Sequence, residues 1–149
     1  TTLLKDPVAL KESVDRLVDH YQDLDVELIV GIESRGFIFG MPLAYQLGVG
    51  FVLVRKPGKL PAEILAESYE LEYGTNTLEI HVDAIKKGQK VLVVDDLLAT
   101  GGTAQATCRL VEKLGGQVVG VAFAIELNYL NGREKLPGYD IFSLIQYDE

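Results

Sequence analysis

The segment 95–103 holds two carboxylates followed by small and hydroxyl-bearing residues, directly after the strand-like run 90–94. Its glycines let the backbone approach an anion closely, and a helical pattern begins at its end. A helix N-terminus favours phosphate because its first N–H groups lack partners within the helix. The acids repel phosphate but suit sugar hydroxyls, or a metal ion that the ligand carries. The segment therefore predicts a site for a phosphorylated sugar, formed by Asp95, Asp96, Ala99, Thr100, Gly101, Gly102 and Thr103.

A simpler alternative for this segment is a strand end with a glycine-rich helix cap and solvated acids. The threonines and paired glycines weigh against it, because they supply hydroxyl and backbone donors where a phosphate would bind. The segment is not a Walker motif, since it lacks the lysine and the glycine spacing of that motif.

A second cluster lies between the apolar run 28–32 and a helical pattern. Its backbone N–H groups and its arginine suit an anion, and its residues are Glu33, Ser34 and Arg35. Taken alone, this cluster is better explained as a surface turn with a solvated arginine. Its significance depends on whether the fold brings it to the phosphate segment.

A third cluster places three cations close together in an otherwise acidic chain. Arg55, Lys56 and Lys59 follow the strand-like run 51–54. A short charge run is usually only a solvated face. Beside a second anion site, however, it fits a doubly charged group such as pyrophosphate.

Other kinds of chemistry find little support in the sequence. The two histidines, His20 and His81, are isolated, and Cys108 is the single cysteine, so no metal centre made of protein side chains is expected. We interpret Cys108 as a buried, inert thiol. The chain has no Gly-x-Ser-x-Gly elbow, so a hydrolase triad is not supported.

The elements that position these clusters alternate along the chain. Apolar runs predict strands over 28–32, 51–54, 90–94, 118–127 and 141–147. Helical patterns begin at Pro7, cover 37–47, and follow the phosphate segment to about residue 114. Strands that alternate with helices predict an α/β fold, with a mostly parallel sheet flanked by helices on both faces. Ligands of such sheets bind beyond the carboxyl ends of the strands, where all three clusters fall.

The segment 55–75 differs from the rest, because it is rich in charges, glycines and prolines. We interpret it as a long excursion that is partly a β-hairpin, and such excursions are often functional. A further strand is predicted over 78–82. Tyr69 and Tyr73 have strand spacing and are expected to face the same side as packing residues.

Composition bounds the remaining possibilities. The 149 residues fit one domain, and 48% of them are hydrophobic, enough for a sizeable core. No stretch approaches the roughly 18 consecutive apolar residues of a membrane helix, and the first residues do not form a secretory signal. We therefore expect a cytoplasmic protein without a membrane partner. The net charge of −8 argues against non-specific nucleic-acid binding.

The clusters together resemble a known family. The stretch 91–103 resembles the phosphoribosyl-pyrophosphate signature of the type I phosphoribosyltransferases. The set as a whole resembles the adenine branch of that family, through the segments 33–37, 54–61, 69–74, 95–103 and 130–136. The resemblance covers essentially the whole chain. It implies transfer of a phosphoribosyl group from phosphoribosyl pyrophosphate to adenine, which gives AMP and pyrophosphate.

The resemblance also implies roles for individual residues. The segment 99–103 would bind the ribose 5-phosphate, and the acid pair would face the ribose hydroxyls. Arg35, with the backbone of Glu33 and Ser34, would bind pyrophosphate, and the Arg55, Lys56 and Lys59 cluster would surround it, partly across a homodimer interface. The segment 55–75 would be a mobile hood. On it, Glu72 would exchange a proton with the purine imidazole, with Tyr73 and Leu97 near the base.

Two further expectations come from the family alone. Mg²⁺ would arrive bound to the pyrophosphate rather than at a site of its own. Family members have a segment before the position of Thr1 that contributes an aromatic residue and an arginine to the base site, and the 149-residue sequence lacks it. We therefore expect 1–149 to be a single phosphoribosyltransferase domain without that base-contacting segment.

Three rival interpretations stay open at this point, and one of them is a catalytically inactive fragment that keeps the fold. A regulatory protein that binds the same ligand would need a basic face or an added helix-turn-helix, which the acidic composition and the length disfavour. A phosphoribosyltransferase for hypoxanthine, guanine or xanthine shares the phosphate segment. The hood sequence 69–74 favours adenine.

Overall fold

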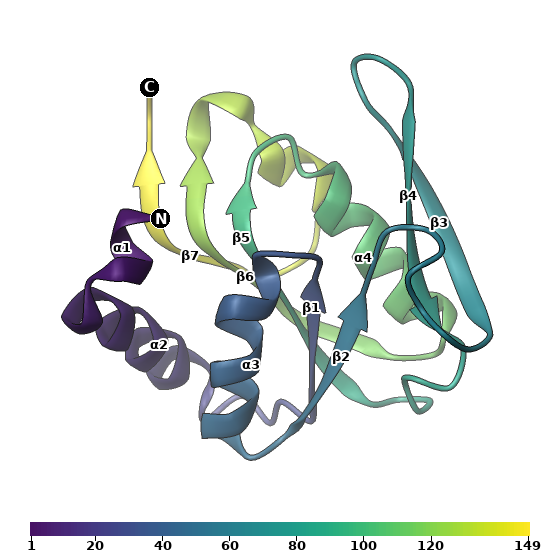
Figure 1. The fold of residues 1–149 in the computed structure, drawn as a ribbon, viewed down its shortest axis with the longest axis horizontal. Coiled ribbons are helices and arrows are strands. Elements are labelled where there is room, and N and C mark those ends of the chain that lie inside the picture. The colour runs from purple at the N-terminus through teal and green to yellow at the C-terminus, as the bar shows by residue number, and fades with distance from the viewer.

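A computed structural model describes residues 1–149, and its centre is a five-stranded parallel sheet in the order β2-β1-β5-β6-β7. All neighbouring strands run the same way, so their carboxyl ends meet at one edge (Figure 1). Helical crossovers join most of the strands, as a parallel sheet requires. The strands are β1 (Leu28–Ile32), β2 (Gly50–Val54), β5 (Lys90–Leu98), β6 (Gln117–Leu127) and β7 (Ile141–Tyr147).

Helices cover both faces of this sheet. The longest, α2 (Pro7–Tyr21), begins at the predicted Pro7, where the Asp6 carboxylate caps the helix by accepting hydrogen bonds from two backbone N–H groups. The short helix α1 precedes it and was not predicted. The remaining helices are α1 (Thr2–Lys5), α3 (Gly36–Leu47), α4 (Gly102–Lys113) and two 3₁₀ turns, η1 (Asn128–Leu130) and η2 (Gly132–Lys135).

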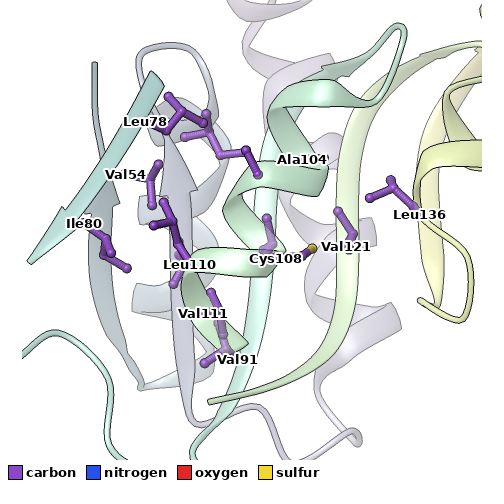
Figure 2. Packing of buried hydrophobic residues seen from close by; sticks show 14 of the residues in the cluster. Val54, Leu78, Ile80, Val91, Ala104, Cys108, Leu110, Val111, Val121 and Leu136 are labelled. Carbon is purple, nitrogen blue, oxygen red and sulfur yellow. The ribbon is translucent and has the colours of Figure 1, made fainter. Parts of the chain in front are cut away.

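Two hydrophobic clusters lie on the two faces of the sheet. One packs β1, β5 and β6 against α2 and α3 through ten buried side chains, among them Leu17, Ile29 and Leu43. The other packs the opposite face against α4, where Leu110 and Val111 are fully buried (Figure 2). Because the central strands are buried on both faces, they are apolar without alternation.

A two-stranded antiparallel hairpin stands beside the sheet. It consists of β3 (Ile64–Glu70) and β4 (Thr75–His81), and its tip rises beyond the carboxyl edge of the sheet (Figure 1). Leu78 and Ile80 of β4 are buried against the α4 side of the sheet, which anchors the base of the hairpin. The predicted strand 78–82 is thus the returning arm of this hairpin.

Two predictions about local structure need correction. The acid pair and the next two residues were placed in a loop, but β5 continues through Asp95 to Leu98, paired with β6. Tyr69 and Tyr73 were expected to share one face of a strand. Instead β3 ends at Glu70, and Tyr73 lies in the hairpin turn with 87% of its surface exposed.

Cys108 is buried within α4, as predicted. No helix of the structure is long and apolar enough to cross a membrane.

Candidate active site

A cavity of about 630 Å³ opens at the carboxyl edge of the sheet, between the strand ends and the hairpin. Its volume lies within the range of small-molecule sites. The walls combine cationic, acidic and hydroxyl side chains from segments far apart in sequence. The residues that carry its chemistry are Arg35, Lys56, Tyr69, Asp95, Asp96 and Thr103.

The acid pair differs in burial, which gives its two members different electrostatics. Asp95 is only 8% exposed, and burial raises the pKa of its carboxyl group well above the ordinary value, with the neighbouring Asp96 charge adding to the effect. The Asp96 backbone N–H donates to Asp95 Oδ1 at 2.8 Å. Asp96 itself is more exposed and faces the cavity.

The phosphate segment turns sharply after β5 and enters α4. Gly101 has a φ of +85°, a left-handed conformation that favours glycine, and no side chain caps the helix N-terminus that follows. Within this turn lies a small hollow of about 60 Å³ at the start of α4. Its lining includes Ala99, Thr100, Gly101, Gly102 and Thr103, so the structure brings together all five predicted residues. Unpaired N–H groups at a helix start suit a phosphate.

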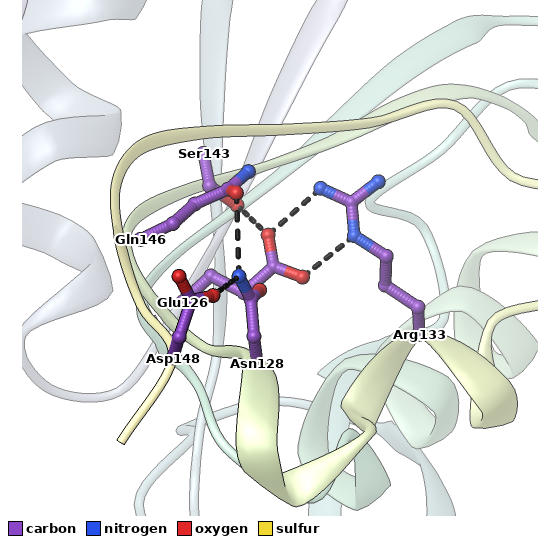
Figure 3. Close-up of polar contacts among 6 residues, drawn as sticks. All are labelled: Glu126, Asn128, Arg133, Ser143, Gln146 and Asp148. Carbon is purple, nitrogen blue, oxygen red and sulfur yellow. Dashed lines mark hydrogen bonds and ion pairs between the residues drawn. The ribbon is translucent and has the colours of Figure 1, made fainter.

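A polar network supports this turn from behind. Glu126, at the end of β6 and only 3% exposed, accepts two hydrogen bonds from the Arg133 guanidinium, at 2.6 and 2.7 Å (Figure 3). Ser143 Oγ donates to the same carboxylate at 2.6 Å. The hydrogen bonds from Arg133 lower the pKa of Glu126.

This network positions η2 against the phosphate turn. Gly132, next to Arg133, lies so close that a Cβ on it would meet the Ala99 carbonyl oxygen at 2.4 Å. A Cβ on Gly101 would likewise meet the Gly132 carbonyl oxygen at 2.4 Å. Glycine is therefore required on both sides of this contact, and sequence reasoning assigned no role to the segment that provides it.

The second predicted cluster also reaches the cavity. Glu33, Ser34 and Arg35 form the turn between β1 and α3, and the peptide bond between Glu33 and Ser34 is cis. The Arg35 side chain is 69% exposed and its Nε donates to Asp96 Oδ2 at 2.5 Å. The structure thus joins the predicted pyrophosphate and ribose sites through one ion pair.

The third cluster divides into residues with different positions. Lys56 lines the cavity. Arg55 instead donates from Nε to Glu33 Oε1 at 2.6 Å, and its other contact is with the Lys59 backbone carbonyl at 3.4 Å. The Lys59 side chain is exposed and outside the cavity wall. In this single chain, only Lys56 of the three cations contributes to the cavity.

The tip of the hood, with Glu72 and Tyr73, lies apart from the acid pair. Glu72 and Tyr73 occupy the exposed hairpin turn and do not line the cavity, whereas Leu97 does. The hairpin therefore stands open, with its tip away from the sheet (Figure 1). For Glu72 to contact a purine base in the cavity, the tip of the hairpin would have to move toward the sheet.

Comparison with known proteins places this geometry in a family. A model of the phosphoribosyl transferase domain matches residues 4–147. The chain belongs to the phosphoribosyltransferase family. It is 60% identical to the adenine phosphoribosyltransferase of Solibacter usitatus over 149 residues, covering 100% of this chain and 86% of that protein.

Solved structures of the family agree with the fold. The crystal structure of adenine phosphoribosyltransferase from Thermoanaerobacter pseudethanolicus has a TM-score of 0.95 and 58% identity, covering 97% of this chain and 84% of that one. The enzyme from Saccharomyces cerevisiae, complexed with an imino-altritol bisphosphate and adenine, has a TM-score of 0.88 and 43% identity, covering 95% and 82%. The predicted type I phosphoribosyltransferase fold is confirmed.

The donor set of this phosphoribosyltransferase suits a metal ion carried by a ligand. No three His, Cys, Asp or Glu side chains gather as a metal-binding group. The cavity offers two adjacent carboxylates, of which Asp96 is already paired with Arg35. Mg²⁺ is commonly held by one or two carboxylates together with substrate phosphates, so these residues fit an ion that arrives on phosphate oxygens.

One residue of the cavity was given no site role from sequence. Tyr69 was interpreted as a packing residue, but its hydroxyl accepts a hydrogen bond from Thr103 Oγ1 at 3.2 Å, at the start of α4. Its position in a strand-like segment of the hood gave no signal for this contact. The packing of β3 against α4, where Glu67 forms ion pairs with Arg109 and Lys113, brings it there.

Proposed function

We propose that this protein transfers the 5-phosphoribosyl group from 5-phosphoribosyl-1-pyrophosphate (PRPP) to adenine, giving AMP and pyrophosphate. The observation that carries the proposal is a cavity lined by the acid pair and by Arg35 and Lys56, next to the hollow of the phosphate turn, with which it shares Asp95, Ala99 and Thr103. A sugar that carries phosphate at one end and pyrophosphate at the other matches this arrangement. The names of the close relatives supply the base, adenine.

The 5-phosphate would bind in the hollow of the phosphate turn. Backbone N–H groups at the start of α4 and the Thr100 and Thr103 hydroxyls are the donors. The close contact between Gly101 and Gly132 fixes the turn before the ligand arrives. Such preorganisation lowers the entropic cost of ordering the turn when the ligand binds.

The ribose and pyrophosphate would lie across the mouth of the cavity. Asp95 and Asp96 accept hydrogen bonds from the ribose hydroxyls, because carboxyl oxygens keep acceptor capacity in either protonation state. Arg35 and Lys56, with the backbone of Glu33 and Ser34, bind the pyrophosphate. Arg55 and Lys59 contribute through a partner subunit rather than within their own chain.

The chemical step would be displacement of pyrophosphate from the anomeric carbon by a purine nitrogen. Positioning two reactants contributes roughly 7–11 kcal/mol. Cations at the departing pyrophosphate stabilise the charge that grows as the bond breaks. Glu72 exchanges a proton with the purine imidazole once the hood has closed, Tyr73 and Leu97 border the base, and closure excludes water from the activated sugar.

Mg²⁺ would enter with the pyrophosphate and would supply further neutralisation of its negative charge. The protein's own part is to orient that charged group. Arg35 and Lys56 would bind the pyrophosphate, and Asp95 and Asp96 are the residues that would hold the ion. The two adjacent carboxylates in the cavity wall, Asp95 and Asp96, support this arrangement.

The test is an assay of each purine with PRPP and Mg²⁺. We expect AMP and pyrophosphate with adenine, and no nucleotide with hypoxanthine, guanine or xanthine. IMP or GMP formation at a comparable rate would contradict the choice of base. If no purine is consumed while PRPP still binds, a regulatory binding protein becomes the better explanation.

The same proposal includes a homodimer. Its support is the position of Arg55 and Lys59, which lie outside the cavity of their own chain although they belong to its cationic cluster. Light scattering on the purified protein would measure the mass in solution. A mass of one chain at assay concentrations would contradict the dimer.

A further inference from the structure

Tyr69 joins the hairpin to the phosphate turn through two contacts with successive residues. Its hydroxyl accepts from Thr103 Oγ1 at 3.2 Å. Its ring lies over Gly102, where a Cβ would meet Tyr69 Cδ2 at 2.9 Å. Any larger residue at position 102 would displace the ring. Gly102 therefore also makes room for Tyr69.

The tyrosine hydroxyl has a proton with no acceptor in the protein. Its oxygen accepts from Thr103 Oγ1 and, at 3.5 Å, from Asn76 Nδ2, and it donates to no protein group. Tyr69 lines the main cavity together with Thr103. A phenol hydroxyl is both donor and acceptor, so this one offers a donor beside the hollow of the phosphate turn.

The place of Tyr69 is fixed by the strand that carries it. Two residues earlier, Glu67 forms ion pairs with Lys113 and, at 3.7 Å, with Arg109, both on α4. On the other strand, Leu78 is buried against the same side of the sheet. The base of the hairpin is thus attached to α4, while the tip with Glu72 extends beyond it.

We propose that Tyr69 is a ligand of the substrate's 5-phosphate, a role that rests on the proposed function. When the phosphate binds, Thr103 turns its hydroxyl from Tyr69 to a phosphate oxygen. Tyr69 donates its own hydroxyl proton to the same phosphate, while its ring stays on Gly102. The 5-phosphate then links the hairpin to the phosphate turn, three residues before Glu72.

The experiment uses Tyr69→Phe, which keeps the ring and removes only the hydroxyl. Calorimetry would measure the affinity of the purified protein for ribose 5-phosphate and, separately, for pyrophosphate with Mg²⁺. A hydrogen bond to a charged group predicts a loss of roughly tenfold or more for ribose 5-phosphate. Pyrophosphate has no 5-phosphate, so its affinity should stay within about twofold of the wild type.

Steady-state kinetics give a second readout. The KM for PRPP should rise by a similar factor, and the KM for adenine should not change. Tyr45→Phe is the matched control, because Tyr45 is 77% exposed on α3. It should leave both affinities and both KM values unchanged.

Three outcomes would overturn the inference. Unchanged affinity of Tyr69→Phe for ribose 5-phosphate would show that the hydroxyl does not bind the phosphate. Equal losses for both ligands, or a clear fall in the unfolding temperature, would assign Tyr69 to packing. If the wild type itself did not bind ribose 5-phosphate, the proposed function would fail first and the inference with it.

Discussion

Arg35 Nε donates to Asp96 Oδ2 at 2.5 Å although the two residues are 61 positions apart in the chain. The pair connects the turn after β1 with the end of β5, at the mouth of the cavity. Asp96 is thereby paired with the Arg35 guanidinium, the group that the proposed function assigns to pyrophosphate. Ligand and carboxylate compete for Arg35, so binding of pyrophosphate includes the cost of breaking this ion pair.

The first prediction concerns Asp96→Asn. Removing the competing charge should tighten the binding of pyrophosphate without Mg²⁺ by roughly two- to fivefold, the equivalent of an exposed ion pair. The same change should weaken ribose 5-phosphate by about three- to tenfold, because a neutral amide is a poorer acceptor for ribose hydroxyls. Calorimetry with each ligand measures both effects.

The control for this variant is Asp15→Asn. Asp15 forms an exposed ion pair with Lys11 on α2, so it reproduces the change in net charge without touching the cavity. If Asp15→Asn tightened pyrophosphate binding as much as Asp96→Asn did, the effect would be one of overall charge and not of competition for Arg35.

The second prediction concerns stability and pH. Burial raises the pKa of Asp95 above the ordinary value of 3.8, with Asp96 adding to the rise and Arg35 opposing it. As pH rises from about 4, the unfolded chain releases this proton before the folded chain does, so the folded state loses stability until Asp95 also ionises. Each tenfold difference in proton affinity corresponds to about 1.4 kcal/mol.

Asp95→Asn lacks this penalty while it keeps an oxygen to accept from the Asp96 N–H. It should therefore unfold at a higher temperature than the wild type at neutral pH, and the difference should shrink as pH falls toward 4. Thermal unfolding followed by circular dichroism between pH 4 and 8 measures it. A difference that does not change with pH would contradict the buried-acid explanation.

The pattern of apolar residues along the sequence was sufficient to predict the sheet and the carboxyl edge at which the cavity opens. The apolar run 28–32 coincides with β1, because a strand buried between two layers carries a strong local signal. The run 141–147 coincides with β7, an edge strand that is only partly buried. The phosphate turn was also predicted, since Gly101 and Gly102 mark both the sharp turn and the helix start. The end of β5 was missed because Asp95 and Asp96 are polar, whereas pairing with β6 continues past them.

Contacts between distant segments could not be predicted in the same way. The ion pair of Arg55 with Glu33 and the contact of Tyr69 with Thr103 join segments 22 and 34 residues apart. Neither has a periodicity or a motif, because each depends on how two distant elements pack against each other in space. The expected roles of Glu72 and Tyr73 came from family resemblance, and they stay predictions while the hairpin is open.

The third prediction concerns the network behind the phosphate turn. Glu126→Gln leaves the Arg133 guanidinium without its charged partner (Figure 3), and it should lower the free energy of unfolding by about 1.5–3 kcal/mol. The pKa of Glu126 is lowered by Arg133, so the stabilisation is present at neutral pH and is lost as pH falls through the folded-state value. Chemical denaturation at pH 7 and pH 4 measures both.

Because Arg133 adjoins Gly132, the same variant should also weaken ribose 5-phosphate binding. Glu12→Gln is the control, since Glu12 pairs with Arg16 on the exposed face of α2 and should cost at most about 1 kcal/mol. An equal loss of stability in both variants would mean that burial of Glu126 contributes nothing. If Glu126→Gln bound ribose 5-phosphate with unchanged affinity, the network would not be what positions the phosphate turn.

The last prediction concerns proton transfer by Glu72. Glu72→Gln retains the size and a hydrogen-bonding side chain but cannot exchange a proton, so kcat with adenine should fall by roughly 10²–10⁴-fold. The KM for PRPP should stay close to the wild-type value, because Glu72 lies outside the cavity that would bind PRPP. Glu70→Gln is the control: Glu70 is an exposed acid at the end of β3, two positions away. Full turnover of Glu72→Gln across pH 5–9 would exclude Glu72 as the proton-transfer group and would leave orientation and charge stabilisation by Arg35, Lys56 and the acid pair as the main sources of catalysis.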